Sequence, residues 1–327
     1  MRTFVRRTIK LLILAALFFG ALYLFTVRPF VFESFSQGSV AHAQPERLRS
    51  DIKLLTSAGP RDRSNPPVLA SVADQILQRF EESNSRVSLQ TFLVQGSSFS
   101  NVISEYGFAS SAGTIIIGAH YDTELNTPGA DDNASGVAGL LELGRLLSQS
   151  PPPVRVLLVA YALEEGPFFL SGDMGSFIHA KSLRQANEKI RLMISLESIG
   201  YFADAAGSQR YPLDLISWLY PGRGDFIAIV GQPDLSPATL SIKRAFARST
   251  RLPSYSINTP EVVPGINSSD HVSFWRSGFD AVMITDTAMF RNPNYHTPSD
   301  LPETLDYARM AQVVDGVLAY VMAASPR

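Results

Sequence analysis

Short, nearly continuous apolar runs alternate along this chain with longer stretches whose apolar residues recur at helical spacing. One such stretch places Val137, Leu140, Leu141 and Leu147 on one face, which is typical of an amphipathic helix. Helices are predicted over residues 45–57, 68–84, 137–150, 173–183 and 304–324. Nearly continuous apolar runs are typical of strands that helices cover on both faces, and they span residues 114–119, 154–163, 190–196, 226–230 and 281–285. The alternation predicts an α/β domain whose central sheet is mostly parallel and flanked by helices on both faces.

The N-terminal region has a different pattern. An uncharged apolar run covers residues 11–27, and the basic residues Arg2, Arg6, Arg7 and Lys10 precede it. This combination predicts a cytoplasmic tail (1–10), a transmembrane anchor (11–27), a stalk (28–44) and one domain outside the cytoplasm (45–327). The alternative is a signal peptide cleaved near Ala41-His42-Ala43, which would release a secreted or periplasmic protein; that triplet lies further from the apolar run than is usual.

The composition limits the class of protein and the residue types that could bind a metal or act as a nucleophile. Hydrophobic residues make up 45% of the 327 residues, charged residues 18%, and the formal net charge is −2. These values fit a globular enzyme and give no indication of nucleic-acid binding. The chain contains no cysteine, so disulfides, thiolate metal sites and a cysteine nucleophile are excluded, and any metal must be bound by His, Asp and Glu.

Ionisable residues follow the predicted strands where each strand ends. His120 follows the first, Glu164 and Glu165 the second, Glu197 the third, and His296 lies in the loop after the last. In open α/β sheets the ligand site lies beyond the carboxyl ends of the strands, so these side chains are expected to converge.

Asp132, Glu164, Glu165 and Glu197 would repel one another there unless cations compensated their charge. Two divalent ions would do so, with His120 and His296 as neutral ligands. Such mixed sites suit Zn²⁺, and cobalt and manganese accept the same ligand types.

Several motifs together resemble one family. GAHYD, GADDNASG, the Glu-Glu pair after a strand, SDH near position 270 and YHTPSD resemble the M28 family of co-catalytic zinc aminopeptidases over residues 45–327. The resemblance implies two zinc ions per chain, one held by His120, Asp132 and Glu197, the other by Asp132, Glu165 and His296. It also implies a cis peptide bond between Asp132 and Asn133.

The same resemblance gives roles to neighbouring residues. Glu164 would be the general base, which takes a proton from the attacking water and delivers it to the leaving amine. Tyr295 would stabilise the oxyanion, or alternatively pack on the core as a loop tyrosine. Asp122 would accept the far N–H of His120, or alternatively cap turn amides.

Other residues receive local interpretations. Asp131 is expected to stabilise the turn before the helix at 134–150, and Ser269 to cap a helix, whereas Asp270 and His271 are expected beside the substrate. His42 and His179 are not expected to be ligands. Glu197 replaces the aspartate of many family members, and residues 167–169 add bulk that would line a pocket or join the core.

Three functions follow from this reading. The first is an aminopeptidase acting on peptides with a free N-terminus. The second is a glutaminyl cyclase-like transferase with a single zinc, which the complete two-metal ligand set argues against. The third is a non-catalytic ectodomain, although such receptors lose ligands or the base. A serine hydrolase is disfavoured because the chain has no G-x-S-x-G elbow.

Overall fold

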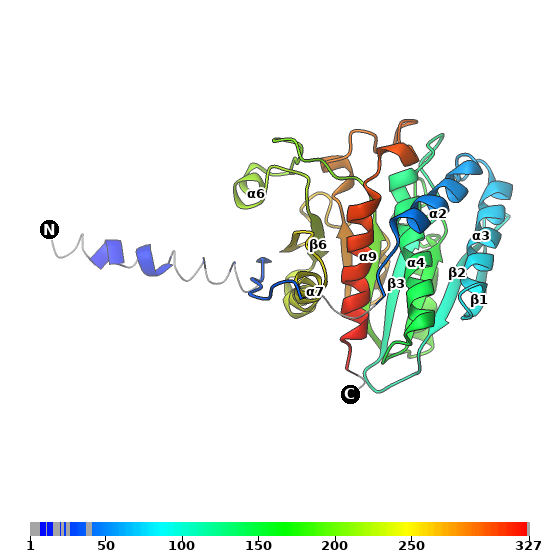
Figure 1. Ribbon diagram of the computed structural model, residues 1–327, viewed down its shortest axis with the longest axis horizontal. Coiled ribbons are helices and arrows are strands. Elements are labelled where there is room, and N and C mark those ends of the chain that lie inside the picture. The colour runs from blue at the N-terminus through cyan, green and yellow to red at the C-terminus, as the bar shows by residue number, and fades with distance from the viewer. Residues whose placement is uncertain are drawn as a thin grey trace.

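The apolar runs lie side by side in one sheet. The computed structural model describes residues 7–10, 12–15, 20, 23, 27–36 and 41–325, and within them eight strands pair in the order β1-β2-β4-β3-β5-β8-β6-β7 (Figure 1). Their bounds are β1 (Arg86–Val94), β2 (Ser97–Tyr106), β3 (Thr114–His120), β4 (Val156–Tyr161), β5 (Ile190–Glu197), β6 (Ile227–Gly231), β7 (Ser254–Asn258) and β8 (Ala281–Thr285).

The sheet is mixed but mostly parallel, as predicted, since four of its seven strand pairings are parallel. The central strands β4, β3, β5 and β8 are parallel to one another, but β1 pairs with β2, β2 with β4 and β6 with β8 in antiparallel fashion. The hairpin of β1 and β2 had not been predicted, because β1 is a largely exposed edge strand and lacks a continuous apolar run.

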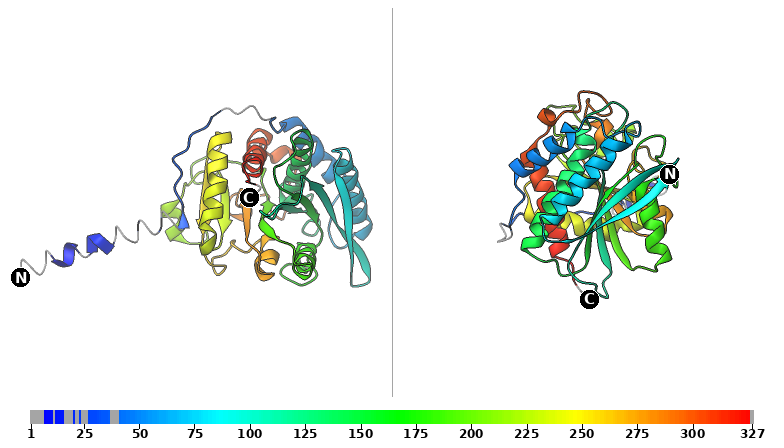
Figure 2. Two further views of the ribbon diagram at one scale, coloured as in Figure 1. Left: turned by 90° about the horizontal axis from the view of Figure 1, so that it is seen from below. Right: turned by 90° about the vertical axis from the view of Figure 1, so that its right-hand side faces the viewer.

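Helices cover both faces of the sheet (Figure 2). Every residue of β3 and β4 is buried, since side chains alternate between two apolar layers. Ile115 and Ile117 belong to the layer under α2, α4, α7 and α9, whereas Ile116 belongs to the smaller layer under α5 and α8. This double coverage confirms the α/β architecture.

The predicted helices form within a few residues of their expected bounds. The helices are α2 (Pro45–Ser57), α3 (Pro66–Glu81), α4 (Gly136–Gln149), α5 (Gly175–Gln185), α6 (Asp214–Leu219), α7 (Ser236–Ser249), α8 (His271–Arg276) and α9 (Tyr307–Met322). Proline occupies the first turn of α2 and α3, where its missing N–H costs nothing. In α9 the Asp306 side chain accepts a hydrogen bond from the backbone N–H of Arg309.

The segment before the domain packs against it. Arg28 donates to the carbonyl of Leu219 at 2.6 Å and lies 4.7 Å from the ring centroids of Tyr220 and Tyr255. Glu33 pairs with Arg244 and Arg248 of α7 at 3.1 and 3.3 Å. The described part of the predicted stalk is therefore docked on the domain.

The predicted anchor at residues 11–27 lies largely outside the described residues. Among those that are described, no helix combines the length and apolar character needed to cross a bilayer. The anchor stays a prediction.

Candidate active site

The predicted ligand side chains converge at the carboxyl ends of the central strands. His120 ends β3, Glu165 lies four residues beyond β4, and Glu197 ends β5. His296 lies in the loop after β8. Asp132 lies in the kinked segment η2 (Ala130–Ser135) between β3 and α4, where Asp132 and Asn133 have non-helical backbone angles, and the peptide bond between them is cis, as predicted. Residues far apart in sequence thus meet at one rim of the sheet.

Asp132 stands between two groups of side chains. Its Oδ1 is 3.2 Å from Nε2 of His120, and its Oδ2 is 3.0 Å from Nε2 of His296. On the first side, Nε2 of His120 is also 3.3 Å from Oε2 of Glu197; on the second, Nε2 of His296 is 3.3 Å from Oε1 of Glu165. The two triplets share one carboxylate and use a different oxygen of it.

These separations fit a tetrahedral metal. With metal–ligand distances of about 2.0–2.1 Å, neighbouring ligand atoms on a tetrahedron are about 3.3–3.4 Å apart. The four nitrogen–oxygen distances within the two triplets are 3.0–3.3 Å. The donor set of imidazole and carboxylate is one that zinc accepts.

The protonation of His120 leads to the same inference. Its Nδ1 lies 3.1 Å from the backbone carbonyl of Asp122 and can donate to it. A neutral ring then directs the lone pair of Nε2 at two carboxylate oxygens, which repels them. A proton or a metal ion between these atoms removes the repulsion.

Burial shifts the carboxyl groups of the rim toward protonation. Burial raises the pKa of Glu164 well above its ordinary range, and together with the charge of Asp132 it raises the pKa of Glu165 to about 7. The pKa of Glu197 is also raised, chiefly by burial. A nearby divalent cation would favour the ionised forms, so the cluster suits cation binding.

Asp122 holds the Glu-Glu pair in place. Its carboxylate accepts hydrogen bonds from the backbone N–H groups of Glu164 and Glu165, both at 3.0 Å. Its Oδ1 is 3.6 Å from Nδ1 of His120, so that ring donates to the Asp122 backbone carbonyl rather than to the carboxylate. Asp122 therefore positions Glu164 and Glu165 through its carboxylate and His120 through its backbone carbonyl.

Glu164 projects beside the ligands of the first triplet. Its Oε2 lies 4.0 Å from Nε2 of His120, and the residue is 5% exposed. Leu163, directly before it, has a φ of +62°, a conformation that non-glycine residues rarely adopt. Ser198 and His296 share this feature with φ of +48° and +55°. Unusual backbone conformations of this kind are common at functional sites.

Tyr295 stacks on His296. The ring centroids are 3.8 Å apart with an interplanar angle of 15°. Burial raises the pKa of Tyr295, and the charges of Asp132 and Glu197 add to this, so its phenol stays protonated and can donate a hydrogen bond.

Asp270 and His271 lie at the start of α8. Asp270 is fully buried, and burial raises its pKa to about 7. The Nε2 of His271 lies 2.8 Å from the carbonyl of Ile266, and its ring packs edge-on against Trp275. His271 thus supports the loop at 263–268 rather than the metal ligands.

Ser269 does not cap α8 as expected. The N-cap position belongs to Asp270, and no side chain caps the helix there. The hydroxyl of Ser269 instead donates to Oε2 of Glu197 at 2.8 Å and contacts Ser195 at 2.8 Å. It orients a predicted ligand.

Asp131 bonds to residues far away in the sequence, whereas only a local role in the turn was predicted for it. Its Oδ1 accepts from the N–H of Gly200 at 2.9 Å and its Oδ2 from the side chain of Asn292 at 2.7 Å. The backbone N–H groups of Asp131 and Asp132 donate to the carboxylate of Asp300, the last residue of the YHTPSD motif, at 2.9 and 3.1 Å. Two aspartates therefore tie the bridging residue to neighbouring loops.

Two further residues had not been recognised from sequence. Arg61 is fully buried and donates to the carbonyls of Tyr121, Pro128 and Gly129 at 2.8, 2.7 and 2.8 Å, so it closes the loop that carries Asp122. Glu124, which had been given no role, has a carboxylate oxygen within 4.8 Å of ligand atoms of Glu165 and His296. It adds negative charge at the outer edge of the second triplet.

The bulky insertion after the Glu-Glu pair contributes to the core. Phe168 is 7% exposed and belongs to the main apolar layer.

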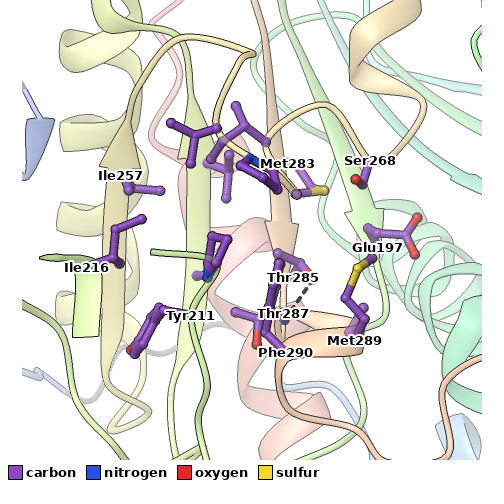
Figure 3. Close-up of a pocket in the computed structure, with 18 of the residues that line it drawn as sticks. Glu197, Tyr211, Ile216, Ile257, Ser268, Met283, Thr285, Thr287, Met289 and Phe290 are labelled. Carbon is purple, nitrogen blue, oxygen red and sulfur yellow. Dashed lines mark hydrogen bonds between the residues drawn. The ribbon is translucent and has the colours of Figure 1, made fainter. Parts of the chain in front are cut away.

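An apolar pocket adjoins the rim (Figure 3). Glu197 and Tyr295 stand at the boundary between the ligand cluster and this pocket. Its other lining residues include Tyr211, Ile216, Tyr220, Phe226, Ala228, Val230, Tyr255, Ile257, Ile266, Met283, Thr285, Met289 and Phe290.

Known proteins resemble this chain in sequence. Residues 101–321 match the family described as Peptidase family M28. The chain is 49% identical over 286 residues to the Escherichia coli (strain K12) protein YfbL, described as uncharacterized, and the match covers 85% of this chain and 87% of YfbL. It is 26% identical over 309 residues to a probable leucine aminopeptidase of Arthroderma otae, covering 88% of this chain and 74% of that protein.

Solved structures share the fold. The LapA aminopeptidase of Legionella pneumophila has a TM-score of 0.68 at 18% identity, covering 86% of this chain and 71% of LapA. A glutaminyl cyclase of Bacteroides thetaiotaomicron bound to N-acetylhistamine has a TM-score of 0.66 at 18% identity, covering 88% of this chain and 100% of the cyclase. The match to the family model spans more than half of the residues of this chain. The chain therefore belongs to peptidase family M28.

Proposed function

We propose that this protein is a zinc-dependent aminopeptidase that removes N-terminal residues from peptides. The observation that carries the proposal is the pair of ligand triplets that share Asp132, with Glu164 beside them. Several relatives are named leucine aminopeptidases, which supports the same reaction class.

His120, Asp132 and Glu197 would hold one ion, and Asp132, Glu165 and His296 the other. Zn²⁺ bound there would act as a Lewis acid that polarises the scissile carbonyl and makes water more acidic. Glu164 takes the proton from the attacking water and passes it to the leaving amine. The hydroxyl of Tyr295 donates a hydrogen bond to the carbonyl oxygen of the substrate as negative charge develops on that oxygen. Glu124, which is not one of the five proposed ligands, provides negative charge at the outer edge of the second triplet that attracts the α-amino group of the substrate.

The test uses aminoacyl-naphthylamides with a free amine and their N-acetylated counterparts. The purified chain is assayed as isolated, after removal of metal by a chelator, and after Zn²⁺ is returned. We expect cleavage only of the free amines, its loss on chelation and its recovery with zinc. Cleavage of acetylated substrates at an equal rate, or cleavage that persists without metal, would contradict the proposal.

A glutaminyl cyclase is the second candidate, because structures of such enzymes share the fold. We favour the peptidase because both ligand triplets are complete, which fits two metal ions, whereas a cyclase-like enzyme would use a single zinc. Glutaminyl-naphthylamide separates the two reactions: a peptidase releases naphthylamine, whereas a cyclase releases ammonia and leaves the naphthylamide bond intact. One zinc per chain by elemental analysis, together with ammonia release, would favour the cyclase.

We also propose that residues 11–27 anchor the chain in a membrane, with the catalytic domain outside the cytoplasm. The sequence pattern supports this, since basic residues precede an uncharged apolar run. Recovery of the full-length chain in the membrane fraction after alkaline washing, with a domain accessible to external protease, is the expected result. A chain that begins near residue 44 in the soluble fraction would support the cleaved signal peptide instead.

A further inference from the structure

Helix α6 has an apolar face that the domain leaves uncovered. None of its residues is buried, and Leu215, Trp218 and Leu219 are 62%, 81% and 39% exposed. Their spacing of three and four positions places them on one side of the helix, whereas Ile216 is half-buried and lines the apolar pocket. Tryptophan is mostly buried in globular proteins, and a cluster of exposed apolar side chains is typical of a surface that binds a partner.

The stalk holds α6 close to the end of the predicted anchor. That anchor ends at Val27, and the next residue, Arg28, donates to the carbonyl of Leu219 at 2.6 Å. The guanidinium of Arg28 also lies 4.7 Å from the centroids of two tyrosine rings. The carbonyl of the following Pro29 accepts a hydrogen bond from the buried Lys243 of α7. A single arginine side chain therefore separates α6 from the end of the predicted anchor.

This position corresponds to the headgroup layer of a bilayer. That layer extends about 5–8 Å beyond the hydrocarbon on each side. Tryptophan is enriched there because its ring is amphipathic. Phe30 and Phe32 of the stalk are 60% and 91% exposed and lie edge to face, with ring centroids 4.9 Å apart. The stalk thus adds exposed apolar rings shortly after the predicted anchor.

Basic side chains accompany the apolar ones. Arg244 and Arg248 of α7 have side chains that are 50% and 61% exposed, and both pair with Glu33 of the stalk, so one positive charge is in excess. Arg223, shortly after α6, is also exposed. Such cations attract the anionic headgroups of a membrane. A lipid surface fits this combination better than a second copy of the chain, which would bring like charges together.

The opposite end of the domain provides a reference position. In the strand order, β7 and β1 lie at the two edges of the sheet, with α6 and α7 at the β7 end (Figure 1). Eight strands spaced by about 4.8 Å separate these edges by roughly 30 Å. Leu93 of β1 is 75% exposed, so it resembles Leu215 and Trp218 in exposure but lies at the far edge.

We propose that the exposed face of α6, together with Phe30 and Phe32, docks on the surface of the bilayer in which the chain is anchored. The inference rests on the proposed membrane anchor and is independent of the proposed peptidase reaction. Docking turns the β7 edge of the sheet toward the lipid and the β1 edge away from it.

Tryptophan fluorescence tests the docking, because the chain has two tryptophans, Trp218 and the part-buried Trp275. The full-length chain is reconstituted in vesicles of phosphatidylcholine and phosphatidylglycerol, with or without phosphatidylcholine brominated near the headgroup end of its acyl chains. Bromine quenches rings that it contacts, so the wild type should lose most of the emission that Trp218 contributes. Trp218→Phe, which retains only Trp275, should lose little.

Variants at the far edge serve as matched controls. Leu93→Trp in the Trp218→Phe background moves the probe to β1 and should show no more quenching than Trp218→Phe alone. In the wild-type background, Leu215→Glu places a carboxylate on the docking face, where contact with lipid is costly, and should reduce the quenching of Trp218. Leu93→Glu should leave that quenching unchanged. Both leucines are exposed, so neither substitution disturbs the core.

Failure of the docking differs from failure of the anchor. If the chain resists alkaline extraction from the vesicles but brominated lipid leaves Trp218 unquenched, the docking is wrong while the anchor stands. Equal quenching of the Leu93→Trp probe would overturn the docking as well. If alkaline washing releases the chain from the vesicles, the anchor and the docking fall together.

Discussion

Two pairs of histidines lie in different parts of the molecule and have opposite surroundings. At the rim of the sheet, His120 and His296 each place Nε2 within 3.3 Å of two carboxylate oxygens. In the core near α5 and α8, His179 bonds to the hydroxyl of Tyr161 at 3.0 Å and His271 to the carbonyl of Ile266 at 2.8 Å. The rim has an excess of negative charge, whereas the core gives each ring one neutral partner.

The surroundings of a histidine therefore indicate its role better than burial does, since His120 is buried whereas the side chain of His296 is 33% exposed. Burial lowers the pKa of both core rings to about 4, so they stay neutral. At His296 burial also acts to lower the pKa, but the hydrogen bonds to Asp132 and Glu165 outweigh it and raise the value to about 10. The two carboxylate oxygens beside Nε2 of each rim ring make these positions suited to a cation.

Removal of the shared carboxylate should have the largest effect. Asp132→Ala deletes a ligand from both triplets, so we expect loss of both zinc ions and a fall in kcat/KM of at least about 10³-fold. Elemental analysis and the naphthylamide assay measure the two results. Asp234→Ala, on an exposed residue away from the rim, is the control. Two zinc ions at full occupancy in Asp132→Ala would refute the bridging role.

Glu164→Gln should separate catalysis from metal binding. The variant keeps nearly the same shape and leaves all five ligand residues intact, so two zinc ions should remain. Loss of the base should lower kcat by about 10²- to 10⁴-fold. Glu81→Gln, at the exposed end of α3, controls for a general effect of charge removal. Near-normal turnover in Glu164→Gln would exclude it as the base.

Ser269→Ala should give a smaller effect. Loss of the hydrogen bond to Oε2 of Glu197 leaves that ligand less well oriented, and such changes typically reduce metal affinity by about 10- to 100-fold. Competition with a zinc chelator measures the affinity. Ser241→Ala, on the exposed face of α7, should match the wild type. If both variants bind zinc equally well, Ser269 has no positioning role.

The convergence of the proposed ligand residues could be predicted because several of them follow strong local patterns. His120 and Glu197 end strands that are largely apolar, and the order of the motifs is characteristic of the family. The shared position of Asp132 came from that resemblance, since no local pattern indicates that two oxygens of one carboxylate face different histidines.

The supporting residues could not be predicted because their contacts are long-range. Arg61 lies in the polar segment GPRDRSNPP and resembles a solvated surface residue until the loop at 121–129 folds over it. Ser269 has the sequence context of a helix cap, yet its hydroxyl bonds to a residue 72 positions away. Strand β1 alternates in burial at a sheet edge and therefore lacks the apolar run that identified the central strands.

The core histidines predict a pH effect on stability without any metal. The pKa of His179 is lowered to about 4 in the folded state, against about 6.5 in the unfolded state, so the unfolded chain binds the extra proton more readily. The stabilisation is fully present above pH ~6.5 and is lost as pH falls toward ~4, by at most about 3 kcal/mol for this residue. His179→Gln should therefore lose less stability than the wild type between pH 7 and pH 5.

Urea unfolding of the chelator-treated chain at both pH values measures this difference. Because wild type and variant share the same rim, the titration of His120 and His296 cancels between them, and the change in free energy of unfolding reports on His179 alone. Lys181→Gln, at an exposed position of the same helix α5, is the control and should behave like the wild type. An identical pH dependence in His179→Gln and wild type would mean that the buried ring is not held neutral, and the contrast between core and rim histidines would lose its physical basis.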